Sequence, residues 1–223
     1  MLKKIFFTVI SLQFFLFPAL SQLRVDFATD LSILRNFAPG QQFWAFGQDL
    51  KFHFFPVVKD GIYFSACYFS DGKFKDHLTA TAKSPTTIPQ EIQFVNHARL
   101  RMKIMTIGWK HFIKGNNEAE ESWNLYSIAG FGLMFGRATN EYSTVVDTSL
   151  YTLPAQPVNG EGHFKRLTLD LGLGYEYPLV YEIFIYAEAR VSIPTSEYPS
   201  KYLAVNNNAP FPGMLSAGLR MIF

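Results

Sequence analysis

The feature that most constrains the fold of this chain is a strict alternation of apolar and polar residues. The clearest run extends from Arg166 to Tyr177, where leucines and tyrosines alternate with charged residues, threonine and glycine. Successive side chains of a β-strand point to opposite faces, so the pattern predicts strands with one apolar and one polar face. After residue 21 we find no helical periodicity. The eight predicted strands are residues 23–37, 43–55, 61–70, 98–109, 123–136, 166–177, 182–193 and 215–223.

The first 21 residues have the pattern of a secretory signal peptide. Two lysines precede an apolar run from Ile5 to Phe17, and residues 19–21 form a small-x-small cleavage site. Pro18 ends the run well short of the ~20 residues that a membrane-spanning helix needs. We therefore expect residues 1–21 to be cleaved. Residues 22–223 have a length that suits one all-β domain.

The alternation alone does not say which face lies inside the protein. A soluble β-sandwich buries its apolar faces, whereas a membrane barrel turns them to lipid and keeps polar residues in its lumen. Several predicted strands exceed ten residues, about the length that crosses the hydrocarbon at a tilt. Glycine recurs on the polar faces, at 47, 130, 132, 136, 172, 174 and 218, where it would make room for large side chains in a narrow barrel. Both features favour the membrane barrel.

The lengths of the connections favour a barrel as well. Counted from a periplasmic start, the odd connections are residues 38–41, 70–92, 138–162 and 194–210, and the last three are long. The even connections, 56–60, 114–121 and 178–180, are short. Short periplasmic turns, long extracellular loops and aromatic residues at both rims, such as Trp44 and Trp123, are typical of outer-membrane barrels. The predicted fold class is all-β: an eight-stranded antiparallel up-and-down transmembrane β-barrel.

The end of the sequence carries the most specific motif. Residues 215–223, LSAGLRMIF, place apolar residues at every second position and finish on an aromatic. This resembles the C-terminal strand of bacterial outer-membrane β-barrels, and the whole chain resembles the small OmpA- and OmpX-like barrels and, more closely, the PorT-like barrels. The resemblance implies a Gram-negative outer membrane, contact with its lipid and lipopolysaccharide, and insertion by the barrel-assembly machinery. The residues that match the assembly signal are Leu219, Met221 and Phe223.

The polar faces predict a lumen that is closed by ion pairs. An eight-stranded barrel is just wide enough for its own side chains to fill it. The predicted lumen holds eight basic and six acidic residues, which nearly balance, as buried charges require. These residues are Arg24, Asp26, Asp30, Asp49, Lys51, Arg99, Arg101, Lys103, Arg166, Asp170, Glu176, Glu188, Arg190 and Arg220.

No catalytic or cofactor motif stands out in the sequence. Lipid A deacylases of this shape carry a serine two residues from a histidine on one strand face, and none of the five histidines here is followed by such a serine. The glycine-rich residues 130–136 lie within a predicted strand, not at the strand–turn–helix of a phosphate-binding loop. The histidines form no ligand-like cluster, and a net charge of +2 gives no nucleic-acid footprint. We expect neither enzymatic activity nor a metal.

Three functions remain open at this stage. The first is a structural or surface-binding role through the extracellular loops, because binding often resides in loops held on a rigid scaffold. The second is a secretion-accessory barrel that holds a protein partner, as the PorT-like resemblance would allow. The third is a narrow channel for small solutes. The polar loop of residues 138–162 is the longest candidate binding surface.

Overall fold

The computed structural model describes residues 24–38, 40–118, 122–180, 182–196, 202 and 210–223, so the predicted signal peptide lies outside the described residues. Within this part of the chain, eight long antiparallel strands form a ring in the order β1-β2-β3-β4-β5-β7-β8-β9, and β9 pairs with β1 to close it. A ninth, two-residue strand, β6, pairs with β3 outside the ring. The strands are β1 (Arg24–Asn36), β2 (Phe43–Val57), β3 (Asp60–Ala82), β4 (Glu91–Lys114), β5 (Asn124–Tyr142), β6 (Tyr151–Thr152), β7 (Gly160–Val180), β8 (Ile183–Pro194) and β9 (Pro212–Ile222).

The outer surface of the barrel wall is apolar, and charged side chains are buried in the lumen. Leu31 is 75% exposed and Phe131 is 70% exposed, whereas Lys51 and Arg220 are each 1% exposed. A soluble sandwich would bury the leucine and phenylalanine instead. The exposed apolar wall is therefore the surface that faces lipid, and the predicted eight-stranded transmembrane barrel is confirmed.

Glycine leaves room at positions where a large side chain crosses the narrow lumen. Gly108 and Gly130 lie opposite each other on β4 and β5. A Cβ added to Gly108 or Gly130 would lie 2.6 or 2.8 Å from the Tyr63 side chain, and one added to Gly174 would lie 2.1 Å from the Tyr126 ring. Because such approaches are sterically forbidden, these two tyrosines occupy space that only glycine leaves free.

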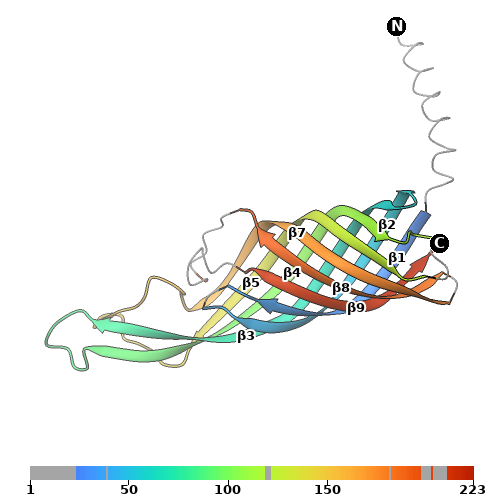
Figure 1. Cartoon of the computed structure of the whole chain (residues 1–223). Coiled ribbons are helices and arrows are strands. Elements are labelled where there is room, and N and C mark those ends of the chain that lie inside the picture. Colours follow the sequence, from blue (N-terminus) through green and yellow to red (C-terminus); the bar gives the residue numbers. More distant parts are fainter. Residues whose placement is uncertain (1–23, 39, 119–121, 181, 197–201, 203–209) are drawn as a thin grey trace, which may run out of the picture.

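The largest departure from the predicted strands is a hairpin that projects from one end of the barrel (Figure 1). The sequence predicts a loop over residues 70–92, but β3 continues to Ala82 and pairs with β4 from Glu91 onward. We call this projection, residues 73–98 together with β6, the arm. Its residues Leu78, Ala80, Phe94 and Tyr151 form a separate apolar cluster with Val146 of the connection between β5 and β6.

The arm lies on the extracellular side in the orientation that outer-membrane barrels adopt. The C-terminus and the start of β1 lie at the other end of the barrel (Figure 1). The turn between β2 and β3 and the turn between β7 and β8 are only two residues long, and short turns face the periplasm in such barrels. The arm therefore extends away from the cell.

The outer half of β4 has the opposite orientation from the predicted one. The prediction placed Arg99, Arg101 and Lys103 in the lumen. In the structure the even-numbered residues of β4 point inward instead, from Phe94 to Phe112, with no register shift at Gly108. The three basic residues therefore lie on the outer wall, and this part of the lumen prediction was wrong.

The reason is that the extracellular mouth of the lumen is filled mainly by apolar side chains. Leu100, Met102 and Ile104 point inward from β4 and are at most 1% exposed. They belong to one large apolar cluster. Its other buried members are Leu34, Phe43, Ala45, Cys67, Phe69, Met134, Ala138, Phe164 and Met214.

Candidate functional site

A cluster of buried charged residues fills the periplasmic half of the lumen. Arg220 on β9 joins two carboxylates, with Nη1 2.6 Å from Asp26 Oδ2 and Nη2 2.9 Å from Glu176 Oε1. Lys110 Nζ lies 3.2 Å from Glu176 Oε2, and the His53 ring contacts Asp26. All five residues are at most 4% exposed. Buried charges are tolerated only when they are paired, and each of these has a partner.

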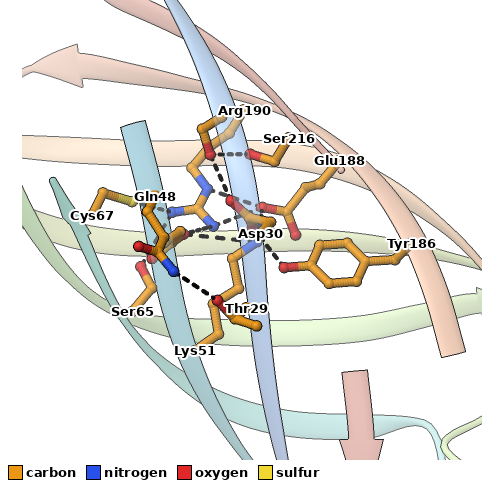
Figure 2. A network of polar contacts seen from close by, with 12 residues as sticks. Thr29, Asp30, Gln48, Lys51, Ser65, Cys67, Tyr186, Glu188, Arg190 and Ser216 are labelled. Carbon is orange, nitrogen blue, oxygen red and sulfur yellow. Dashed lines mark hydrogen bonds and ion pairs between the residues drawn. The ribbon is translucent and has the colours of Figure 1, made fainter. Parts of the chain in front are cut away.

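A second network crosses the middle of the lumen (Figure 2). Glu188 accepts hydrogen bonds from Lys51 Nζ at 2.8 Å, Arg190 Nη2 at 2.6 Å and Tyr126 OH at 3.0 Å. Lys51 Nζ also lies 3.0 Å from Asp30 Oδ2. Residues from four strands, β1, β2, β5 and β8, are thus tied together across the barrel.

Further polar groups extend this middle network. Arg190 Nη2 lies 3.3 Å from Asp49 Oδ2, and Tyr186 OH donates to Asp30 Oδ2 at 2.6 Å. Asp170 is held differently, because threonine hydroxyl groups donate to it, with Thr106 Oγ1 2.6 Å from Oδ2. The lumen is therefore closed by ion pairs in its lower and middle parts and by the apolar cluster at its mouth.

Ten of the fourteen predicted lumen residues lie inside the barrel. Arg166 is one of them, but it donates to the backbone carbonyl of Ser196 near the extracellular mouth. Arg24 is not, because it pairs with Glu118 at the periplasmic rim, at 3.0 Å and with both side chains over 40% exposed. The ten are Asp26, Asp30, Asp49, Lys51, Arg166, Asp170, Glu176, Glu188, Arg190 and Arg220.

Sequence reasoning missed Lys110, the second cation that reaches Glu176. The predicted fourth strand ends at Trp109, so Lys110 was assigned to neither face. The signal that could have placed it in the lumen is its alternation with Ile107, Trp109 and Ile113, which are apolar and face outward. With Lys110 included, the described lumen holds five basic and six acidic residues besides His53, which is close to balance.

One group on the outer wall brings together residue types that hydrolases use. Near the periplasmic rim, Asp60 Oδ1 lies 2.7 Å from His111 Nδ1 and accepts a hydrogen bond from Trp109 Nε1 at 2.9 Å. Ser127 stands opposite His111 in the β4–β5 register. Among the described residues, no hydrogen bond joins His111 to Ser127. The serine is therefore not activated in this arrangement, because nucleophilic catalysis needs a base within hydrogen-bond reach.

No helix among the described residues is long and apolar enough to span a membrane. No group of three or more histidine, cysteine, aspartate or glutamate side chains among them has the arrangement of a metal site.

Solved structures with the same arrangement of strands are small bacterial outer-membrane barrels. Neisserial surface protein A matches with a TM-score of 0.52 and 11% identity, over 89% of this chain and 97% of that chain. OprG from Pseudomonas aeruginosa matches with a TM-score of 0.51 and 12% identity, over 90% and 95%. Ail from Yersinia pestis, in complex with the heparin analogue sucrose octasulfate, matches with a TM-score of 0.50 and 14% identity, over 90% and 99%.

No protein-family model and no curated protein sequence matches the chain. At 11–14% identity, the structural matches show the fold alone. The fold and the charge-filled lumen together define the class: this is a transmembrane β-barrel protein of the bacterial outer-membrane type, with similarity to small eight-stranded barrels.

Proposed function

We propose that this protein is a closed outer-membrane barrel that uses its extracellular arm to bind a ligand at the cell surface. The arm is the observation that supports this role. The membrane anchor is complete where the ring of eight strands ends, yet two strands continue beyond it and are stabilised by their own apolar cluster. Loops on such a rigid support are common binding surfaces.

Apolar residues on the extracellular connections support a binding role further. Ile88, in the turn of the hairpin, is 89% exposed, and Val145 and Leu150, in the connection that packs on the arm, are 99% and 48% exposed. Exposed apolar side chains that share one region often mark an interaction site. The lumen supports the closed state, because the side chains that fill it are almost inaccessible to solvent.

The test compares cells that display the full protein with cells that display a variant lacking the hairpin. In this variant, residues 76–96 are replaced by Asn-Gly, so that the pair of Lys75 and His97 closes a short turn. Both strains are incubated with immobilised surface polysaccharides and matrix proteins. Sucrose octasulfate is included because Ail was crystallised with it.

We expect cells that display the full protein to bind at least one probe. Cells that display the hairpin-less variant should bind that probe about tenfold less. A matched variant, Ile88→Ser with Val145→Ser, keeps the hairpin and tests the two most exposed apolar side chains alone. Slower gel migration after boiling, which folded barrels show, verifies that each variant is folded. Equal binding by the full and hairpin-less proteins, or binding by neither, would contradict the proposal.

Two other functions have their own tests. A secretion-accessory role predicts that a defined protein crosslinks to the periplasmic rim. This crosslink would still form in the variant that lacks the hairpin. A narrow channel predicts that liposomes containing the protein swell in solutions of small solutes.

A hydrolase centred on His111 would require ester cleavage that is lost in Ser127→Ala, and we expect the purified protein to show no such cleavage.

A further inference from the structure

One carboxylate in the lumen differs from the others because no cation accompanies it. The other five each lie within 3.3 Å of a lysine or arginine nitrogen; they are Asp26, Asp30, Asp49, Glu176 and Glu188. Among the described residues, Asp170 on β7 has no such pair, although it is 0% exposed. Its hydrogen-bond donors are the hydroxyl groups of Thr106 and Thr168. These hydroxyl groups do not balance its charge, and an unbalanced buried charge is costly.

The strand register places two further hydroxyl groups beside Asp170. One row of the sheet, from β3 to β8, runs through Tyr63, Gly108, Gly130, Asp170 and Ser192. The Tyr63 side chain lies across the two glycines toward Asp170, because a Cβ added to Gly130 would lie 2.8 Å from the Tyr63 hydroxyl oxygen. Ser192 stands directly opposite Asp170, and side chains in such a position have Cβ atoms about 5 Å apart.

These two hydroxyl groups are buried and have no partner. Tyr63 OH and Ser192 Oγ lack a hydrogen bond among the described residues, and both residues are at most 1% exposed. Most buried polar groups in proteins are hydrogen-bonded. An unpartnered hydroxyl on each side of a carboxylate that has no cation points to a bound group of positive charge.

A third glycine leaves space at the same place. Gly132 on β5 lies between Thr106 and Thr168 in the next row toward the extracellular side. A Cβ added to Gly132 would lie 3.1 Å from Thr106 Oγ1 and closer still to Asp170 Oδ2 and Thr168 Oγ1. Three oxygens from β4 and β7 therefore converge on one point over this glycine. Hard cations take oxygen ligands of these kinds.

We propose that these oxygens form a binding site for one sodium ion inside the lumen. They belong to one carboxylate and four hydroxyl groups, those of Asp170, Thr106, Thr168, Ser192 and Tyr63. One carboxylate balances one positive charge, whereas a divalent ion leaves a buried charge in excess. The ion enters as the ring closes and stays in the folded barrel, because the filled lumen leaves no open path.

The site differs from the metal sites that the sequence led us to consider. The expectation of no metal rested on histidine clusters, and a site of one carboxylate and hydroxyl groups contains none. The site also does not depend on the arm, so it stands or falls independently of the function proposed above.

The test measures whether sodium stabilises the purified full chain in lipid vesicles. Urea unfolding is followed by tryptophan fluorescence in sodium chloride and in choline chloride, because choline is too large for the site. The two salts are used at the same ionic strength, so that charges are screened equally. A ligand that binds only the folded state, at about ten times its dissociation constant, lowers the unfolding equilibrium constant about tenfold. We expect sodium to produce a change of this order.

Asp170→Asn removes the charge of the site and should unfold identically in the two salts. The matched control is Asp49→Asn, which changes a buried lumen aspartate that pairs with Arg190. It should unfold more readily in both salts and keep the ratio between them. If Asp170→Asn fails to fold, Thr168→Val takes its place. This variant keeps the charge, removes one hydroxyl ligand and should reduce the ratio.

Three results would overturn the proposal. The first is equal unfolding of the natural protein in sodium and in choline, which would mean that a proton or a water molecule satisfies Asp170. The second is a sodium effect that persists in Asp170→Asn, which would place the ion elsewhere. The third is an equal loss of the sodium effect in Asp49→Asn and Asp170→Asn, which would make it a general effect of the lumen charges.

Discussion

Glu188 is the residue on which the middle of the lumen most depends. It accepts hydrogen bonds from Lys51, Arg190 and Tyr126, which come from three different strands. A carboxylate at this point compensates two cations that cannot reach water. Losing the Glu188 carboxylate therefore costs more free energy than losing one hydrogen bond, because Lys51 and Arg190 would remain buried without it.

We expect Glu188→Gln to lower the free energy of unfolding by about 3–5 kcal/mol, since it keeps the shape of the side chain and leaves Lys51 and Arg190 short of one negative charge. Urea unfolding of the barrel in lipid vesicles, followed by tryptophan fluorescence, measures this.

The control is Glu118→Ala, which breaks the exposed pair with Arg24 at the periplasmic rim. Exposed pairs contribute about 0–1 kcal/mol, so this variant should unfold almost as the natural protein does. Similar losses in the two variants would show that the lumen charges are hydrated and that the barrel is not filled as described.

At the scale of the element, β4 shows what alternation can and cannot establish. Its two faces were separated correctly, with Arg99, Arg101 and Lys103 on one face and Leu100, Met102 and Ile104 on the other. Which face is inside is a different question, because a strand that leaves the hydrocarbon carries charges outward at the headgroups. Only the pairing with β3 and β5 decided it.

Cysteine labelling tests this orientation directly. In a Cys67→Ser background, Arg101→Cys should react rapidly with a membrane-impermeant maleimide on intact cells, because it lies on the outer wall at the level of the headgroups. Met102→Cys should react at least about tenfold more slowly, since its neighbours in the lumen shield it from solvent.

Met105→Cys serves as the control for lipid exposure. It lies on the same face as Arg101 but within the apolar band, where a polar reagent does not reach. Faster labelling at residue 102 than at residue 101 would restore the orientation that the sequence alone suggested.

At the scale of the whole molecule, closing the ring of eight strands also fills the lumen with side chains. Tyr63, Tyr126 and Arg220 are each at most 2% exposed although they project into the interior of the barrel. An eight-stranded ring leaves little more room than its side chains occupy.

We therefore expect no stable, ion-selective conductance when the purified protein is inserted into planar bilayers. The charged side chains are fixed by one another and do not line an aqueous path. An open porin inserted under the same conditions is the positive control. Reproducible conductance steps from this protein would show that the lumen charges form a pathway and would favour the channel function.

The sequence by itself determined the alternating faces, the apolar wall and the up-and-down order of the eight ring strands. These follow from local rules, because the period of a strand and the length of a turn depend on neighbouring residues. The tertiary structure alone decided that Lys110 joins Glu176, that the mouth of the lumen is apolar, and that β3 and β4 continue into the arm. Those features depend on the register between strands, which links residues far apart in the chain.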